Sequence, residues 1–448
     1  MSTAATELPE GEDPPFRHTL RELPPRVWIV SLGILVNRCG NFLPVFIVLY
    51  LTSNQGYSPG LAGLVLGAAG VGNVLGNAVG GYLADRLGRR WTIALSGGAS
   101  AVLTALVPAL STLFLNIVVV GLVGVASQIY RPAASALLVD SVTTNQQRVA
   151  AFAVFRFAMN IGAAVGGFVG GWLATNSYTE LFLGNAAACL LFGVLGLLFL
   201  RDVPRGGSGE GGEDGAGSAA PAEQASYRQV LADRRLRRFL VMTVIAEFVY
   251  IQSTVGLPLH VTSSGLTASD LGLLIGLNGV LVLVFELPIA GLVVKRRAAY
   301  VLAVGNLFTG IGLALTGFAT SMVLLCATVV LWSLGEMMYS SVANAHLGGM
   351  SPPNMVGRYQ GLYGAAFTFG TGVGPLVGGA IYAFNEWALW ATVGVAGLIS
   401  AQLCLPSRRA PALPEQPRGP SGAAEPTGSG AADTAAGTAD EKARPSSP

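Results

Sequence analysis

Two long apolar segments of this chain, about 59–84 and 91–110, are joined by the run Gly80-Gly81-Tyr82-Leu83-Ala84-Asp85-Arg86-Leu87-Gly88-Arg89-Arg90. The run holds one acid and three arginines, and it is too short to form a domain. Such a cluster must stay in water, because a charge at the centre of a bilayer costs roughly 2.5–3.5 kcal/mol on insertion scales. The run therefore indicates a connection between two membrane spans.

The composition extends this interpretation to the whole chain. Of 448 residues, 52% are hydrophobic and only 11% are charged, whereas a soluble domain has about 25% charged residues. A span needs roughly 20 apolar residues, and long runs without strand-like alternation favour helices over a barrel. We predict an all-α membrane protein with twelve spans, at about 27–51, 59–84, 91–110, 113–139, 148–174, 181–200, 239–262, 270–294, 299–318, 321–346, 357–383 and 387–405.

The charged run resembles the loop motif between helices 2 and 3 of the major facilitator superfamily of secondary transporters. The matching residues are Gly81, Leu83, Asp85, Arg86, Gly88, Arg89 and Arg90. The resemblance covers about 27–405 and implies two six-helix bundles that rock around a central site. It also implies a cytoplasmic gating latch, in which Asp85 meets the N-terminal end of helix 11 and Asp140 pairs with Arg86 or Arg89. The plainer alternative is a charge cluster that only sets topology.

The basic residues predict the orientation. Of 26 Lys and Arg residues, three lie inside spans, and the others occupy the N-terminus, the 2–3, 4–5, 6–7, 8–9 and 10–11 connections, and the C-terminal tail. Basic residues concentrate in cytoplasmic loops, and residues 1–26 lack the basic start and apolar core of a signal peptide. We expect a multi-pass protein of the bacterial cytoplasmic membrane, with both termini in the cytoplasm.

The chain also divides into two related halves. We predict a cytoplasmic N-terminus (1–26), an N-terminal six-helix bundle (27–200), a cytoplasmic linker with a basic interfacial helix over Tyr227–Arg238 (201–238), a C-terminal six-helix bundle (239–405) and a disordered cytoplasmic tail (406–448). The glycine pattern of helix 5 recurs in helix 11 at an offset of about 208 residues, as expected for the superfamily's parallel repeats.

Small residues spaced four apart allow helices to approach closely. They occur in helices 2, 5 and 11, as Gly72, Gly76 and Gly80; Gly162, Gly166 and Gly170; and Gly370, Gly374 and Gly378. Two interpretations stay open: packing alone, or seams that slide as the halves rock. The helix-5 pattern resembles the antiporter motif G-x-x-x-G-P-x-x-G-G of the superfamily, with Gly167 in place of the proline; the complete form lies in helix 11, where Pro375 follows Gly374.

Six charges lie within the spans, and their signs separate by half. Arg38, Arg131 and Arg156 belong to the first half, and Glu247, Glu286 and Glu336 to the second. We predict positive and negative walls that face each other across one cavity, with Arg38 and Arg131 holding an anionic group or a counter-carboxylate. The alternative is that these residues form structural salt bridges.

The carboxylates are the predicted proton-coupling groups, with Glu336 first, Glu247 second and Glu286 third. Glu336 stands about 14 residues into helix 10, or roughly 21 Å along its axis, which places it past the midplane toward the cytoplasm. Its surroundings loosely resemble helix 10 of the proton-coupled oligopeptide transporters. By contrast, Asn37-Arg38-x-Gly40 and Tyr130-Arg131-Pro132 resemble bacterial drug-efflux members. Candidate polar groups of the cavity are Tyr130, Asn160, Tyr250, Gln252, Asn278 and Tyr339.

We therefore expect a proton-coupled exporter of a small amphipathic compound such as a drug or secondary metabolite. Two alternatives remain: proton-coupled uptake of a zwitterion or peptide, and a transporter-like sensor without flux. No nucleotide-binding motif is present, and no spacing of His or Cys residues indicates a metal site or a disulfide. We expect no enzymatic activity, no cofactor and no nucleic-acid partner; the expected partners are the substrate, protons and the bilayer, and the expected state is a monomer.

Overall fold

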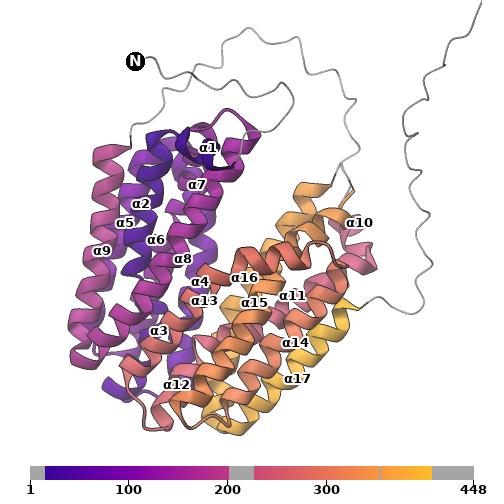
Figure 1. Cartoon of the computed structure of the whole chain (residues 1–448). Helices are drawn as coiled ribbons and strands as arrows, with labels where there is room; N and C mark the ends of the chain where they lie inside the picture. Colours follow the sequence, from indigo (N-terminus) through magenta and orange to yellow (C-terminus); the bar gives the residue numbers. More distant parts are fainter. Residues whose placement is uncertain (1–15, 201–226, 353–354, 406–448) are drawn as a thin grey trace, which may run out of the picture. The chain divides into compact units, whose positions relative to one another are not determined.

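The computed structural model describes residues 16–200, 227–352 and 355–405 (Figure 1). Those residues form helices and connections, and they contain no strand. The predicted linker core, the C-terminal tail and most of the N-terminus lie outside the described residues. The helices up to residue 200 are α1 (Phe16–Arg21), α2 (Pro25–Cys39), α3 (Leu43–Leu49), a π-helical turn η1 (Tyr50–Asn54), α4 (Pro59–Leu87), α5 (Arg89–Leu106), a 3-10 turn η2 (Val107–Ala109), α6 (Leu113–Gln128), α7 (Tyr130–Asp140), α8 (Asn145–Asn176) and α9 (Tyr178–Phe199).

The second half has the same organisation. Its helices are α10 (Tyr227–Ala232), α11 (Arg234–Tyr250), a 3-10 turn η3 (Ile251–Ser253), α12 (Gly256–Ser263), α13 (Ala268–Val293), α14 (Ala298–Thr316), α15 (Met322–Met350), α16 (Val356–Phe384) and α17 (Glu386–Cys404). The single basic helix predicted over Tyr227–Arg238 is instead interrupted at Asp233. The side chain of Asp233 caps α11 by accepting a hydrogen bond from the backbone N–H of Arg235, at 2.8 Å, which starts a new helix there.

Twelve helical segments of the described chain are long and apolar enough to cross a membrane. They lie at the predicted places: Pro25–Asn54, Pro59–Leu87, Arg89–Ala109, Leu113–Asp140, Gln146–Asn176, Tyr178–Phe199, Arg234–Ser263, Ala268–Val293, Ala298–Thr316, Met322–Met350, Val356–Phe384 and Glu386–Cys404. The predicted all-helical membrane protein with twelve spans is confirmed. The first, fourth and seventh spans are each built from more than one helix.

Helix pairing repeats between the halves. In the first half α4 packs on α6, α5 on α9, and α2 on α8; in the second half α13 packs on α15, α14 on α17, and α11 on α16. Numbered by span, these are the pairs 2–4, 3–6 and 1–5, followed by 8–10, 9–12 and 7–11. The halves meet through α8 with α13 and through α4 with α16, which are spans 5, 8, 2 and 11. Corresponding spans of the two halves therefore form both the bundles and the interface between them.

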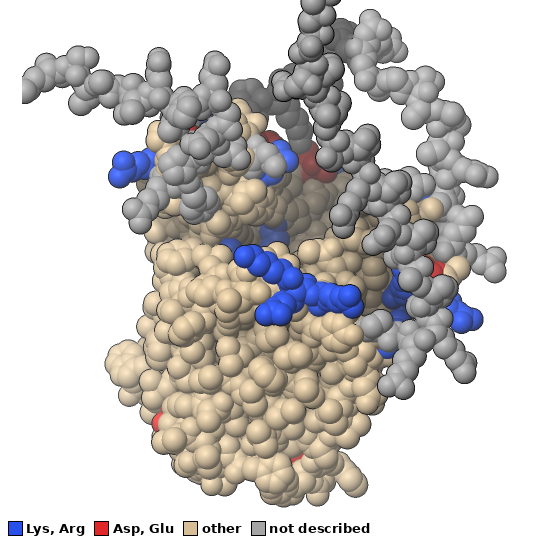
Figure 2. Space-filling model, turned by 45° about the vertical axis from the view of Figure 1, so that its right-hand side comes forward, with Lys and Arg blue, Asp and Glu red and all other residues tan. Residues whose placement is uncertain are grey.

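Charge distinguishes the two ends of the bundle. Figure 2 shows one face, on which Lys and Arg gather in the upper part while the lower part is almost entirely uncharged. Basic residues lie in the α13–α14 connection, on the helix ends beside the α4–α5, α7–α8 and α15–α16 connections, and at the starts of α2 and α11. We call this end the basic end; the opposite end holds the connections around α3 and α12 (Figure 1).

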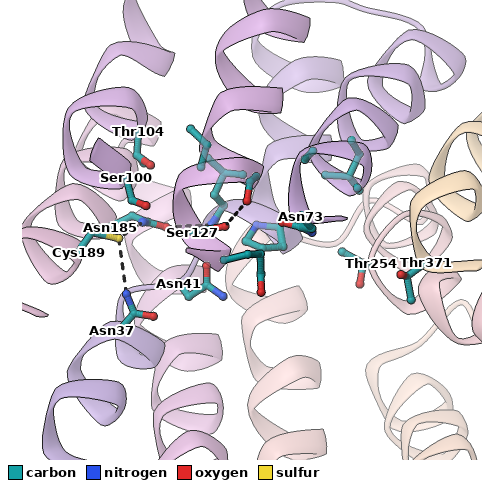
Figure 3. A pocket seen from close by; sticks show the side chains of 18 of the residues that line it. Asn37, Asn41, Asn73, Ser100, Thr104, Ser127, Asn185, Cys189, Thr254 and Thr371 are labelled. Carbon is teal, nitrogen blue, oxygen red and sulfur yellow. Dashed lines mark hydrogen bonds between the residues drawn. The ribbon is translucent and has the colours of Figure 1, made fainter. Parts of the chain in front are cut away.

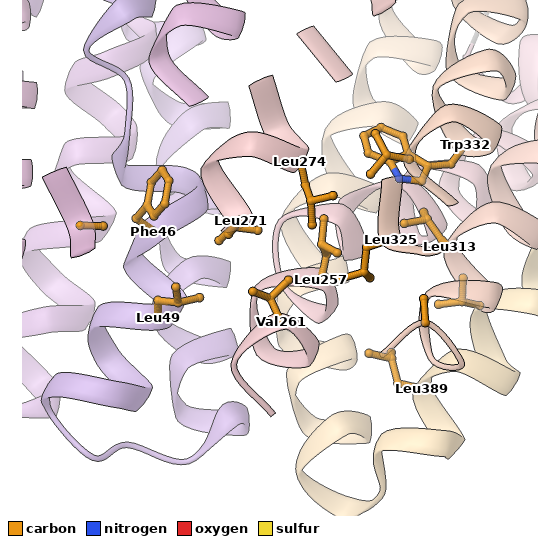
Figure 4. Close-up of a cluster of buried hydrophobic side chains, with 14 of the residues drawn as sticks. Phe46, Leu49, Leu257, Val261, Leu271, Leu274, Leu313, Leu325, Trp332 and Leu389 are labelled. Atoms are coloured by element: carbon orange, nitrogen blue, oxygen red, sulfur yellow. The ribbon is translucent and has the colours of Figure 1, made fainter. Parts of the chain in front are cut away.

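The halves are in tight contact at the opposite end. A Cβ on Gly63 of α4 would lie 2.4 Å from the carbonyl oxygen of Pro375, and a Cβ on Gly171 of α8 would lie 2.6 Å from the Cα of Gly272 on α13. Only glycine allows such backbone approach. A shared apolar cluster lies at the same end, where Phe46 and Leu49 of α3 join residues of α12 and α13 such as Leu257 and Leu271 (Figure 4).

At the basic end the halves separate. Gly81 lies eleven residues after Gly70 on α4, and Gly361 lies eleven before Gly372 on α16; eleven residues are about three helical turns, so each pair shares a face. A Cβ on Gly70 would meet Gly372 at 2.5 Å, whereas a Cβ on Gly81 or Gly361 would meet nothing within 4 Å. The apolar clusters of the basic end also belong to one half each. The described conformation is closed at the opposite end and open at the basic end.

The glycines singled out from the sequence pack inside their own halves. Those of helix 2 face the backbone of Gly121, Val125 and Ile129, those of helix 5 face α2 and its junction with α3, and those of helix 11 face Glu247, Ile251 and Gln252 or their neighbours. The glycines that meet across the halves are a different set. It includes Gly167, where the helix-5 motif departs from proline; a Cβ there would lie 2.6 Å from the backbone nitrogen of Gly276.

Candidate functional site

A pocket lined by acids lies in the second half. Its volume is about 360 Å³, and we call it the carboxylate pocket; its lining is Arg156, Ala246, Glu247, Tyr250, Asn306, Thr309, Glu336, Tyr339, Ser340, Ala343, Asn344, Tyr363 and Phe367. Helices α11, α14, α15 and α16 supply these residues, and the only contribution from the first half is Arg156 of α8. The pocket thus places two of the three predicted carboxylates beside one of the three predicted arginines.

Glu336 is held by uncharged donors from two other helices. The Tyr250 hydroxyl of α11 donates to its Oε1 at 2.9 Å, and the Asn278 Nδ2 of α13 donates to its Oε2 at 3.0 Å. Asn278 also donates to Ser333 at 2.9 Å, which fixes the amide. Because α15 continues to Met350, Glu336 is the middle residue of its helix rather than a residue near the basic end.

Glu247 has a different environment. Its side chain is only 4% exposed, and α16 passes close by, since a Cβ on Gly370 would lie 2.6 Å from the Cβ of Glu247. Among the described residues none donates a hydrogen bond to its carboxylate. A buried carboxylate without a partner is costly when charged, so Glu247 is suited to binding either a proton or a cationic group.

An ion pair joins the halves beside this pocket. Arg156 of α8 donates through Nη2 to Oε1 of Glu286 on α13. Asn160 donates to Oε2 of the same carboxylate at 3.2 Å, and the Ser340 hydroxyl lies 3.4 Å from Oε1. The structure therefore sets one first-half arginine against one second-half glutamate, in the arrangement predicted from their signs.

An apolar cleft lies on the other side of the ion pair. Its volume is about 850 Å³ and its lining is Leu20, Trp28, Val149, Phe152, Ala153, Val154, Arg156, Phe157, Asn160, Val282, Leu283, Glu286, Leu287, Ala290, Ser340 and Ser341. It forms where α8 and α13 diverge toward the basic end, and its rim includes Leu287, which is 78% exposed. Arg156 and Ser340 line both the cleft and the carboxylate pocket, so the two compartments adjoin.

A third compartment surrounds Arg38 in the first half (Figure 3). This Arg38 pocket has a volume of about 150 Å³ and a polar, uncharged lining apart from Arg38: Asn37, Asn41, Asn73, Ser100, Thr104, Ser127, Gln128, Tyr130, Asn185 and Cys189, with apolar residues and Thr254 and Thr371 from the second half. Arg131 follows Tyr130 on α7; its side chain is exposed, and it lines none of the three compartments.

The break between α2 and α3 shapes the Arg38 pocket. The Asn185 Oδ1 of α9 accepts hydrogen bonds from the backbone N–H groups of Phe42 and Leu43, at 3.0 and 3.2 Å. The Phe42 N–H also donates to the carbonyl oxygen of Gly40 at 2.9 Å. Such bonds matter at a helix break because unsatisfied backbone in a membrane costs several kcal/mol. At the preceding Gly40, a Cβ would lie 2.1 Å from the Cβ of Ala188. Side chains of span 6 thus stabilise the break in span 1.

Comparison with known proteins identifies this architecture. Residues 30–307 and 253–434 each match the family model of the Major Facilitator Superfamily, and together they cover most of the chain. The chain belongs to the major facilitator superfamily. It is accordingly a membrane transporter for small molecules and not an enzyme.

Individual relatives of this superfamily member are distant. The uncharacterized MFS-type transporter YqjV of Bacillus subtilis is 26% identical over 80% of this chain and 87% of its own length. The multidrug resistance protein MdtH of Aeromonas salmonicida is 24% identical over 84% of this chain and 94% of its own. A crystal structure of a mutant nucleoside transporter, NupG, superimposes with a TM-score of 0.70 at 14% identity, over 85% of this chain and 98% of that one. The predicted fold of two six-helix bundles is confirmed.

The superfamily loop motif lies at the basic end. Arg89 pairs with Asp140 and also donates to the backbone carbonyl of Ala136 at 3.2 Å, so of the two predicted partners of Asp140 the structure selects Arg89. The guanidinium of Arg86 lies over the Tyr82 ring at 4.9 Å. Asp85 is exposed, and its approach to the N-terminal end of α16 stays a prediction.

Several residues of these compartments gave no signal in the sequence. Trp28, Phe152 and Phe157 are ordinary residues of lipid-facing helices until α13 is placed beside them. Ser100 and Thr104 are small hydroxyl residues, which membrane helices commonly contain. Within the described residues, no group of three His, Cys, Asp or Glu side chains is arranged to hold a metal ion, and the four cysteines are unpaired.

Proposed function

We propose that this transporter exports a small amphipathic compound in exchange for protons, with the basic end in the cytoplasm. The observation that carries the proposal is the joining of two unlike compartments. An apolar cleft of about 850 Å³ adjoins a carboxylate pocket of about 360 Å³ at Arg156 and Ser340. An amphipathic cation would place its apolar body in the cleft and its charge against the glutamates.

Two facts support the orientation and the direction. Basic residues concentrate in cytoplasmic loops, and here they cluster at the end where the halves are open. On this assignment the described conformation is open to the cytoplasm, where an exporter loads its substrate. The name of the relative MdtH, a multidrug resistance protein, agrees with export.

Coupling is proposed to use the carboxylates. A proton and a cationic group compete for Glu336 and Glu247, so substrate binding releases a proton and proton binding releases substrate. A one-for-one exchange of a proton for a monovalent cation moves no net charge, so the pH gradient drives it. One pH unit supplies about 1.4 kcal/mol, which is about a tenfold accumulation. Glu286 is the third candidate, because its carboxylate already accepts from Arg156 and Asn160.

One observation favours the alternative of zwitterion or peptide uptake. The Arg38 pocket of the first half and the carboxylate pocket of the second half offer opposite charges to one molecule. A transporter-like sensor is the remaining alternative, and any measured flux of substrate would exclude it.

The test is transport by the purified protein in proteoliposomes with an imposed pH gradient. We expect a panel of amphipathic cations to accumulate on the side from which protons leave, and collapse of the gradient by a protonophore to abolish the accumulation. Substrate flux that runs only in the direction of the protons would support symport instead. The absence of flux for cations, zwitterions and peptides alike would contradict a transport function.

A further inference from the structure

Arg38 is partly buried, and no acid of the described chain forms an ion pair with it. Its Nε is buried and has no hydrogen-bond partner, and no acidic residue lines the pocket around it among the described residues. Arginine stays charged in proteins, and a charge removed from water without an opposite charge is strongly unfavourable. An anion in the pocket would compensate it.

The pocket offers further unused hydrogen-bonding groups. Ser100 and Thr104 of α5 are 3% and 0% exposed, and their hydroxyl oxygens have no hydrogen-bond partner. The Oε1 of Gln128 is likewise buried and unpaired. Buried polar groups are nearly always satisfied. Water would satisfy the hydroxyls, but only an anion also neutralises Arg38.

The size of the pocket limits the ligand. A cavity of about 150 Å³ holds a molecule the size of benzene. Thr254 and Thr371 of the second half form one wall (Figure 3), so the pocket touches the interface between the halves. A ligand there would be enclosed or released as the halves move.

We infer that the Arg38 pocket binds one small monovalent anion of carboxylate type, with Arg38 as the charge partner and Ser100 and Thr104 as hydrogen-bond donors. The anion is either free or the acidic group of the transported molecule. Binding of a free anion is independent of the proposed export function, whereas binding of an acidic group of the substrate rests on that function.

Binding of free anions tests the inference without a proton gradient. The full-length protein in nanodiscs of uncharged lipid is unfolded thermally in the presence of benzoate, acetate, chloride or gluconate, at constant pH and ionic strength. A ligand that binds only the folded protein raises the melting temperature saturably. We expect saturable stabilisation by benzoate and acetate, and none by gluconate, which is too large for the pocket.

The variants identify the site. Arg38→Gln should abolish the response, whereas Arg26→Gln, the same change on the same helix but outside the pocket, should retain it. If Arg38→Gln does not fold, Thr104→Val and Ser100→Ala remain, and each should weaken benzoate binding about tenfold, the loss of about 1.4 kcal/mol expected for a hydrogen bond to a charged group.

The outcomes separate the two forms. If benzoate competes with transported compounds that carry a carboxylate but not with those that lack one, the substrate supplies the anion. If benzoate binds equally well in the presence of both kinds of compound, the pocket binds a free anion. A response that is unchanged in Arg38→Gln, or in both hydroxyl variants, overturns the inference. Anion binding that persists in a protein without proton-driven flux would contradict the proposed export function alone.

Discussion

The carboxylate of Glu336 is positioned by three helices, because α15 carries it while α11 and α13 supply the donors Tyr250 and Asn278. Hydrogen bonds donated to a carboxylate favour its ionised form, but both donors are uncharged and stabilise that form less than a cationic donor would. Glu247, in the same pocket, accepts no hydrogen bond from the described residues and is nearly fully buried. Of these two neighbouring carboxylates, one accepts hydrogen bonds and the other does not. This difference allows one to take up a proton while the other binds a cation.

Glu336→Gln should abolish gradient-driven transport and leave downhill exchange of substrate intact. Glutamine keeps one acceptor for Tyr250 but cannot exchange a proton, so binding persists while coupling is lost. The measurement compares substrate accumulation driven by a pH gradient with counterflow in its absence. Glu180→Gln, an exposed glutamate of α9, is the matched control and should behave as the unmodified protein. Full pH-driven accumulation in Glu336→Gln would assign the coupling role to Glu247.

The sequence predicted which charges lie inside the spans, because each one is expensive there. It could not predict their partners. Arg156 and Glu286 are 130 residues apart, and only the approach of α8 to α13 brings them together. The sequence also could not predict which charges line a compartment. It places Arg131 inside span 4 beside Tyr130, yet the side chain of Arg131 is exposed and lines none of the three compartments.

At the scale of elements, spans were predictable because apolar length determines them, but their internal breaks were not. The run Asn37-Arg38-Cys39-Gly40-Asn41 interrupts the apolar pattern at the α2–α3 junction, but it does not show what stabilises a break there, because the Asn185 side chain that does so comes from span 6. The interface glycines were missed for a similar reason. Gly63 and Gly272 each stand four residues before another glycine, Gly67 and Gly276, but this spacing does not show which helix each of them faces.

Asp85→Asn should slow the exchange between conformations and leave equilibrium substrate binding within a few fold. Asp85 is an exposed residue of the basic end, distant from the carboxylate pocket, and its charge would stabilise contact with the N-terminus of α16 when this end closes. Single-molecule fluorescence between labels on α4 and α16 measures the rate. Glu22→Gln, an exposed acid of this end in the turn directly after α1, is the control. A large loss of affinity with unchanged exchange would contradict a gating role.

Gly63→Ala should loosen the closed end of the interface. The added Cβ would lie 2.4 Å from the carbonyl oxygen of Pro375, so α4 and α16 must separate. Gly60→Ala is the matched control on the same helix, because its Cβ would meet Ala383 at an ordinary 3.7 Å. Hydrogen exchange read by mass spectrometry should rise in the first half of α4 and the second half of α16 for Gly63→Ala only. Equal protection in both variants would show that this contact does not hold the end closed.

At the scale of the whole molecule, the two halves share two apolar clusters at the opposite end and keep separate clusters at the basic end. Closing the basic end therefore requires the shared cluster around Phe46, Leu257 and Leu271 to part. Arg156 and Glu286 lie on the basic-end side of the tight contact between Ala164 and Gly279. The ion pair thus stands where the helices begin to diverge, between the cleft and the carboxylate pocket.

The orientation of this asymmetric molecule leads to a prediction about access. In a variant without the four native cysteines, Asn344→Cys lies on an exposed stretch of α15 that lines the carboxylate pocket. Thr320→Cys lies in the exposed connection between α14 and α15 at the opposite end. A membrane-impermeant thiol reagent should label Cys at 344 only in inside-out vesicles, and Cys at 320 only in right-side-out vesicles. An imposed pH gradient that drives the halves toward the other conformation should slow labelling at 344 and leave labelling at 320 unchanged, because only the pocket changes its access. Labelling of position 344 from outside would mean either that the basic end faces outward or that the resting protein is open at its other end. Labelling of position 320 from inside in the same protein would show that the orientation is reversed.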